Sequence, residues 1–186
     1  MSRFIFPDGQ AVRAGQEFIR GETRYPADWL EKSTQEERDE AGLVEIAEPA
    51  SVDTRYYTTV ETSPGQYEQT PVAIDDARKA KLADLAALRF IKETAGVAGI
   101  RTDRESQALL TGAALAASLD PDYTVDWKGE AGWTTLNAVQ LLGAAQAVRG
   151  HVQACFSNER AHATAIALLD TVEAIEAYDL SSGWPA

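Results

Sequence analysis

Two clusters in this sequence contain the residue types that acid-base or metal chemistry requires. The first lies in GIRTDRESQALLTGA, residues 99–113, which carries four ionisable side chains: Arg101, Asp103, Arg104 and Glu105. Neighbouring carboxylates are what hydrolases use as general acid and base. Thr102 and Glu105, however, have the spacing of a capping box, and Asp103 falls in the first turn of the helix that would follow. We therefore predict a helix start and no catalytic residues.

The second cluster follows one stripe of the predicted last helix, and all of its members are zinc-ligand types: His151, Cys155, Glu159 and His162. At 1.5 Å per residue the two histidines would lie roughly 16 Å apart along the helix axis. A single ion with ligands about 2 Å away cannot join them, and an adjacent pair supplies only two ligands. The spacing predicts no metal site, and it favours a buried Cys155 with half-exposed histidines.

Other catalytic signatures are missing from the sequence. There is no G-x-S-x-G elbow, no P-loop and no G-x-G-x-x-G after a strand, and one cysteine with two histidines offers no recognisable nucleophile and base. We expect a protein that is not an enzyme and needs no cofactor. The rival from another class is a hydrolase acting on cell-surface polymer, which would require paired carboxylates in a cleft.

Composition narrows the partners. The 186 residues are 45% apolar, and 17 Lys and Arg stand against 29 Asp and Glu, for a net charge of -12. This charge repels nucleic acid and anionic membrane surfaces, so we expect a protein partner. A single cysteine cannot form an internal disulfide, and no apolar run is long enough for a signal peptide or a membrane span. We expect the protein to reside in a cytoplasm.

The first part of the chain, residues 1–74, has the pattern of a small β-rich unit with one short helix. An opening hairpin is predicted from Arg3–Pro7 and Gln10–Ile19. Ser33 and Glu36 have capping-box spacing before a short helix that Gly42 ends. The turn SPGQ then separates two further β-rich runs.

The second part, residues 75–186, predicts a helical domain with three main helices, one of them long, and an inserted hairpin near 123–135. The first helix runs from Asp75 to Gly96, on an apolar stripe of Leu82, Leu85, Leu88 and Ile91. The second ends near Ser118, on a stripe of Leu109, Ala113 and Ala116. The third is capped by Asn137 and runs to about Tyr178, with a kink near Ser157 as the alternative. The fold class is therefore α+β.

Candidate contact residues come from this last part. Gly143, Ala147 and Gly150 recur at spacings of three and four, so one helix face carries small side chains that would let another helix approach closely. Trp127 and Trp133 are expected to fill a small core. Trp184 lies in the turn-rich end SSGWPA, where docking onto its own body or onto a partner are equal alternatives.

The segment from about Lys79 to Leu169 resembles a known family. Its runs RTDRESQALLTGA, VDWKGEAGW and LNAVQLLGAAQAVRGHVQACFSNE are similar to a C-terminal domain of tailed-phage and prophage proteins that are encoded beside tail-fibre genes. Upstream, YPADWLEKSTQEERDEAGL resembles the segment that often precedes this domain, and parts of tail-fibre assembly proteins. The family has no established catalytic residues to transfer.

The resemblance implies a phage protein that binds a tail-fibre or tail-tip protein as an assembly chaperone. It would act in the cytoplasm of the bacterial host, and retention in the virion tail is a further option. A purely structural tail or baseplate component is the alternative. A homo-oligomer is also compatible with the sequence.

Overall fold

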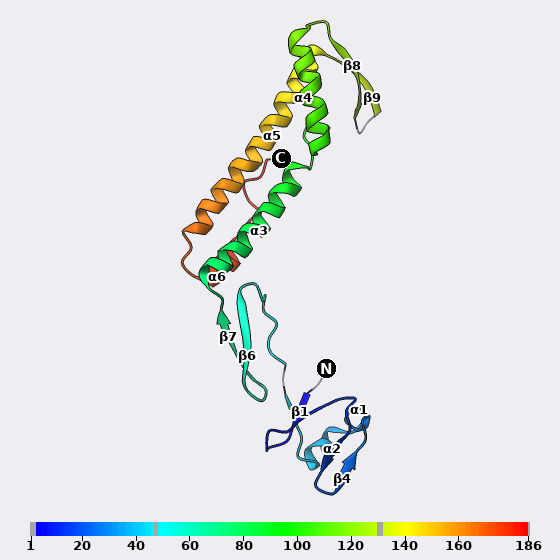
Figure 1. Ribbon diagram of the computed structural model, residues 1–186, viewed down its shortest axis with the longest axis vertical. Coiled ribbons are helices and arrows are strands. Elements are labelled where there is room, and N and C mark those ends of the chain that lie inside the picture. The colour runs from blue at the N-terminus through cyan, green and yellow to red at the C-terminus, as the bar shows by residue number, and fades with distance from the viewer. Residues whose placement is uncertain (1–2, 47, 130–131, 186) are drawn as a thin grey trace. The chain divides into compact units, whose positions relative to one another are not determined.

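The computed structural model describes residues 3–46, 48–129 and 132–185 (Figure 1). The chain is an α+β protein, as predicted, with short sheets first and helices afterwards. It divides into two compact units, Met1–Val72 and Ala73–Ala186. The sequence placed this division after residue 74.

The first unit contains short strands around an aromatic core. Its elements are β1 (Arg3–Ile5), β2 (Ala11–Arg13), β3 (Phe18–Arg20), β4 (Thr23–Tyr25), α1 (Trp29–Lys32), α2 (Gln35–Glu40), β5 (Val44–Ile46), β6 (Tyr57–Ser63) and β7 (Gln66–Pro71). The strands β2, β1 and β5 form an antiparallel sheet, and β3 pairs with β4. Phe18 stacks on Tyr25 with ring centroids 4.6 Å apart, and Trp29 packs edge-on against both rings. These aromatic residues fill a small core of the first unit.

The capping box of the first unit lies one residue later than predicted. Thr34, rather than Ser33, precedes α2, and its hydroxyl accepts a hydrogen bond from the Glu37 amide. The Glu37 carboxylate in turn accepts from the Thr34 amide at 2.7 Å. Ser33 instead ends α1 in an extended conformation, so its neighbour takes the cap of α2. Both spacings satisfy the same motif, and sequence alone does not separate them.

The second unit is the helical domain. Its elements are α3 (Ile74–Glu93), α4 (Arg104–Leu119), β8 (Thr124–Gly129), β9 (Gly132–Asn137), α5 (Ala138–Ala167) and α6 (Val172–Ala177). In Figure 1, α3 and α4 lie along different stretches of the long helix α5. The hairpin β8–β9 is inserted between α4 and α5, as predicted.

The start of α4 confirms the predicted helix but corrects its cap. Asp103 is the N-cap residue, and its carboxylate accepts from the Ser106 amide at 2.9 Å. Thr102 is fully buried and lies outside the helix. Its hydroxyl donates to the Glu93 carbonyl and accepts from the Gly96 amide, so it ties the end of α3 to the chain leading into α4. The Thr102–Glu105 capping box is therefore wrong.

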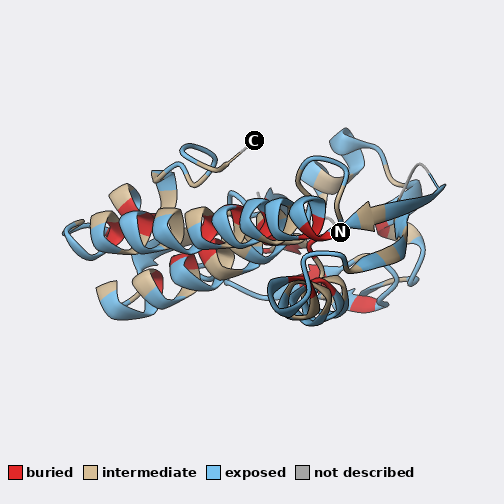
Figure 2. Ribbon diagram, turned by 90° about the horizontal axis from the view of Figure 1, so that it is seen from above, coloured by how far each residue is buried: buried red, intermediate tan, exposed pale blue. Residues whose placement is uncertain are grey.

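The predicted apolar stripes are partly wrong. Leu85 is buried, but Leu82, Ile91 and Leu109 are 39%, 62% and 61% exposed. The inward faces of α3 and α4 are instead formed by Ala77, Lys81, Leu85, Leu110 and Ala117. α4 packs against α5, and α3 packs against α5 and the short helix α6, so the buried strip of each is narrow and adjacent leucines fall outside it. Figure 2 shows the buried residues gathered on the helix sides that face one another.

The long helix begins where predicted and ends earlier. Asn137 caps α5 in a capping box with Gln140. The 30 residues of α5 continue without a break through Ser157, for a length of about 45 Å at 1.5 Å per residue. The helix ends at Ala167 rather than near Tyr178, because Thr171 caps a separate short helix, α6.

Candidate functional site

The hairpin β8–β9 has one face toward the helices and one face away from them. In its register Trp127 lies opposite Thr134, and Lys128 lies opposite Trp133. Side chains alternate between the faces of a strand, so these two tryptophans point to opposite sides. Trp127 packs against the core of α4 and α5, whereas Trp133 is 72% exposed with the Lys128 ammonium 5.8 Å from its ring. The prediction that Trp133 fills a core is wrong.

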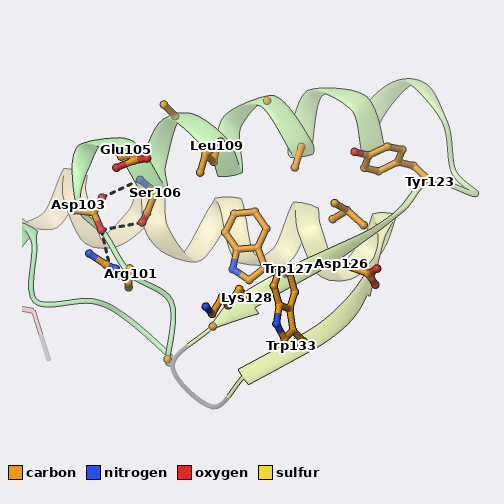
Figure 3. Close-up of a pocket in the computed structure, with 16 residues that line it drawn as sticks. Arg101, Asp103, Glu105, Ser106, Leu109, Tyr123, Asp126, Trp127, Lys128 and Trp133 are labelled. Atoms are coloured by element: carbon orange, nitrogen blue, oxygen red, sulfur yellow. Dashed lines mark hydrogen bonds and ion pairs between the residues drawn. The ribbon is translucent and has the colours of Figure 1, made fainter.

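Two grooves border this hairpin. The groove beside α4, here the α4 groove, is lined by Gly99, Arg101, Asp103, Glu105, Ser106, Ala108, Leu109, Gly112, Ala113, Tyr123, Val125, Asp126, Trp127, Lys128, Gly129 and Trp133 (Figure 3). The groove beside α5, here the α5 groove, is lined by Ala98, Gly99, Ile100, Leu110, Trp127, Gly129, Gly132, Trp133, Thr134, Leu136, Gln140, Gly143, Ala144 and Ala147. Gly99, Trp127, Gly129 and Trp133 line both grooves, so the two grooves adjoin.

Charged residues of the α4 groove are held by structural contacts. Asp103 accepts from the amide and the hydroxyl of Ser106 and pairs with Arg101 at 3.1 Å. These hydrogen bonds, aided by the guanidinium, lower the pKa of Asp103 below its usual value. On the other wall, the Thr135 hydroxyl donates to Asp126 at 2.7 Å. The charged cluster at residues 101–105 is thus a helix start that also lines a groove.

This geometry decides what the α4 groove offers chemically. A general acid needs a carboxyl that holds its proton near neutral pH, which requires a raised pKa. The pKa of Asp103 is shifted the other way, and its oxygens are already engaged. What a ligand would meet is indole surface together with the exposed side chains of Glu105 and Leu109. These groups suit the binding of a ligand.

The α5 groove is more apolar, with a volume of about 610 Å³. Its floor is formed by small residues of α5, its walls include Ile100, Leu136 and Trp127, and the exposed Trp133 lies at its rim. A Cβ on Gly143 would have no atom within 4 Å, so the glycine leaves free space above the helix. A side chain from another molecule can therefore approach the backbone of α5 here.

The structure separates the predicted contact residues. Gly143 and Ala147 both line the α5 groove, and both are exposed. Gly150 is also exposed, and a Cβ there would meet nothing within 4 Å. Within the described residues no helix packs closely on this face at Gly143 or Gly150, and contact with a partner there stays a prediction. α3 and α4 instead contact α5 on the side of Leu141, Val148 and Cys155.

Trp184 docks onto its own domain. Its ring stacks on His162 with centroids 5.9 Å apart and an angle of 24°, and its Nε1 donates to the Leu180 carbonyl at 2.7 Å. His162 Nε2 donates to the Ser182 carbonyl at 3.0 Å, and His162 Nδ1 lies 2.9 Å from the Tyr178 hydroxyl. The C-terminal segment is thus fixed to α5 through one histidine.

The predicted metal-type stripe is engaged in contacts within the protein. His151 Nε2 donates to the Lys92 carbonyl at 3.0 Å, and Glu159 pairs with Arg89 at 3.4 Å. Cys155 is buried as predicted, and desolvation raises the pKa of its thiol. Both histidines are buried rather than half-exposed. Across residues 3–46, 48–129 and 132–185, no group of three or more His, Cys, Asp or Glu could hold a metal ion.

The sequence reasoning missed the exposed tryptophan and the two grooves. One signal for Trp133 was available, because pairing the strands across a short loop places it opposite Lys128, one residue out of phase with Trp127. The grooves left no such signal, since they form only when α4, α5 and the hairpin are assembled.

Fold and grooves together define an α+β protein whose helical domain presents a partly apolar, open surface. Residues 76–181, more than half of the chain, match the family described as Domain of unknown function (DUF4376), and the chain belongs to this family. No curated protein and no solved structure matches it. Within the described residues, no helix is long and apolar enough to cross a membrane.

Proposed function

We propose that this chain is a phage tail-fibre-associated protein that binds the fibre through the hairpin end of its helical domain. It serves as an assembly chaperone for a tail-fibre or tail-tip protein in the bacterial host cytoplasm. The identity of the proposed partner rests on the resemblance of residues 79–169, and of the upstream segment, to proteins encoded beside tail-fibre genes. We infer the location of the contact from the α5 groove.

Three properties of the α5 groove support a protein partner. Its surface is mostly apolar, and Trp133 on its rim is 72% exposed. Tryptophan is among the residues that most often anchor protein interfaces. Gly143 and Ala147 keep the floor low, so a bulky side chain of the partner has room. The net charge of -12 disfavours nucleic acid and anionic membrane as alternatives.

A matched pair of glycines tests this location. Gly143 and Gly150 lie on the same helix and are both exposed with free space above them, but only Gly143 is among the lining residues of the α5 groove. Leucine at either position costs little stability because nothing is displaced. Gly143→Leu fills the groove and is expected to weaken the complex with the fibre protein at least about tenfold. Gly150→Leu leaves binding unchanged.

The experiment is co-expression with the neighbouring fibre protein, followed by gel filtration and titration of the purified partners. We expect the wild-type chain to raise the yield of soluble fibre and to elute with it. If fibre solubility is the same without this protein, and no complex survives gel filtration, the tail-fibre proposal is wrong. If both leucine variants bind normally, the contact lies elsewhere on the chain.

The alternative is a structural tail or baseplate component. Mass spectrometry of purified virions separates the two roles, because a structural component is present at stoichiometric copy number and a transient chaperone is absent. A hydrolase acting on cell-surface polymer is less well supported, since Asp103 is held ionised by its contacts at the helix start.

A further inference from the structure

The strand β9 differs from every other strand in its edge chemistry. A free strand edge can pair with another chain, and proteins usually protect it with charged residues, proline or a bulge. Among the strands of the described residues, β9 (GWTTLN) alone has neither a charged residue nor proline. Its neighbour β8 carries Asp126 and Lys128. The hairpin β6–β7 carries Glu61, Glu68 and Pro71, with a register shift between Glu61 and Ser63.

The outer edge of β9 is also open. β9 pairs with β8 along its length, and no third strand joins this sheet within the part of the chain that the structure describes. The four residues Gly132–Thr135 are all exposed. β8 supplies five consecutive residues of the α4 groove wall, and in Figure 3 it lies between α4 and β9. The edge of β9 away from β8 is thus available for main-chain pairing.

We infer that β9 binds its partner by strand addition, in which an extended segment of another protein pairs with the free edge and enlarges the hairpin to three strands. This inference rests on the proposed function and specifies how that contact is made. In strand addition the main chain supplies affinity, and pockets for alternate side chains supply specificity. Here the α5 groove, lined by Thr134 and Leu136 of β9, receives the side chains on the inner face of the added strand.

The occupant follows from charge and shape. A second copy of this chain brings another net charge of -12 to the interface, so like charges oppose self-pairing. The inner positions of the added strand meet an apolar floor at Gly143, Ala144 and Ala147. The partner segment is therefore an extended stretch of a different protein, about as long as the six residues of β9, with apolar residues at every second position and no excess of acid.

Proline placed at two successive positions tests the pairing. Consecutive residues of a strand direct their N–H groups to opposite edges. The N–H groups of Thr134 and Thr135 therefore point to different edges, one to β8 and one to the free edge. Proline removes the N–H. The variant at the free-edge position is expected to bind the fibre protein about tenfold more weakly with an unchanged melting temperature. The other variant disrupts the hairpin itself, and Thr134→Ala and Thr135→Ala control for the lost side chains.

Amide hydrogen exchange on the unmodified chain gives a reading that does not depend on the variants folding. With the fibre protein bound, alternate amides of β9 should exchange at least about tenfold more slowly than in the free protein. A stable complex in which the free-edge amides of β9 exchange as fast as in the free protein would refute strand addition and leave the proposed function standing. Failure of the wild-type chain to bind fibre removes both proposals. Protection of these free-edge amides in the isolated chain, with a dimer in sedimentation, would make a second copy the occupant.

Discussion

The two ends of the helical domain use the same helix in opposite ways. At the hairpin end, residues 138–150 of α5 face α4 on one side and leave Gly143, Ala147 and Gly150 open on another. At the tail end, residues 151–167 contact α3 and the C-terminal segment. Among the described residues, four of the five buried polar side chains belong to this end: Lys81, Glu93, His151 and His162.

This difference separates an open surface from a closed one. Several buried polar side chains at the tail end have specific partners, such as the Glu176 carbonyl that accepts from Lys81 at 2.7 Å. Such contacts fix one arrangement of the helices, because breaking any of them leaves a desolvated group unpaired. The hairpin end buries few polar groups and keeps small side chains exposed, so it can receive another surface without breaking contacts of its own.

The largest expected effect concerns how many residues of α5 are buried against α4 at the hairpin end. Leu141 is fully buried and Leu142 is 37% exposed, although they are adjacent in α5. Leu141→Ala should lower the free energy of unfolding by about 3 to 4 kcal/mol, through lost burial and a cavity. Leu142→Ala should cost less than about 1 kcal/mol. Similar losses in urea unfolding would show that this part of α5 is enclosed on both sides.

A second prediction concerns the attachment of the tail. His162→Ala removes two hydrogen bonds and the stack on Trp184, so we expect a loss of about 2 to 3 kcal/mol in unfolding free energy. Removing residues 181–186 should cost less, since Tyr178 remains. If both act on the same contact, the combined variant loses clearly less than the sum of the two. Strict additivity in urea unfolding would contradict the tail's attachment through His162.

The junction between the ends provides the third prediction. Thr102→Ala removes the hydroxyl that bridges the Glu93 carbonyl and the Gly96 amide, and it should cost about 1 to 2 kcal/mol. Thr111→Ala is the matched control, because its hydroxyl bonds to the Gln107 carbonyl on an exposed helix face and should matter little. Equal melting temperatures for the two variants would contradict the bridging role.

The smallest effect is a pH dependence at the hairpin end. The pKa of Asp103 is lower in the folded state than in an unfolded chain, so its carboxylate stabilises the fold above the unfolded pKa. This contribution is lost as the pH falls through the folded pKa. Asp103→Asn keeps a capping side chain without the charge. The stability difference between wild type and variant should shrink between neutral pH and about pH 3, and a constant difference would contradict the charge effect.

Local signals in the sequence determined much of this protein. The cap at Asn137, the hairpin near Trp127, the end of α3 before Gly96 and the division of the chain near residue 74 depend on near neighbours, which fix backbone geometry directly. Ambiguity remained where two adjacent residues satisfied the same motif. Ser33 and Thr34 illustrate this, as do Thr102 and Asp103.

Tertiary structure alone decided which side of each element is covered. Leu109 and Leu110 have similar apolarity, and the position of α5 buries only the second. Trp133 is exposed because the hairpin register places it on the face away from the helices. The small residues of α5 indicated that another helix could approach closely. α4 packs on a different side of α5, and the small residues form the floor of a groove. Burial depends on the placement of distant elements, whereas caps and turns depend on residues within about one turn.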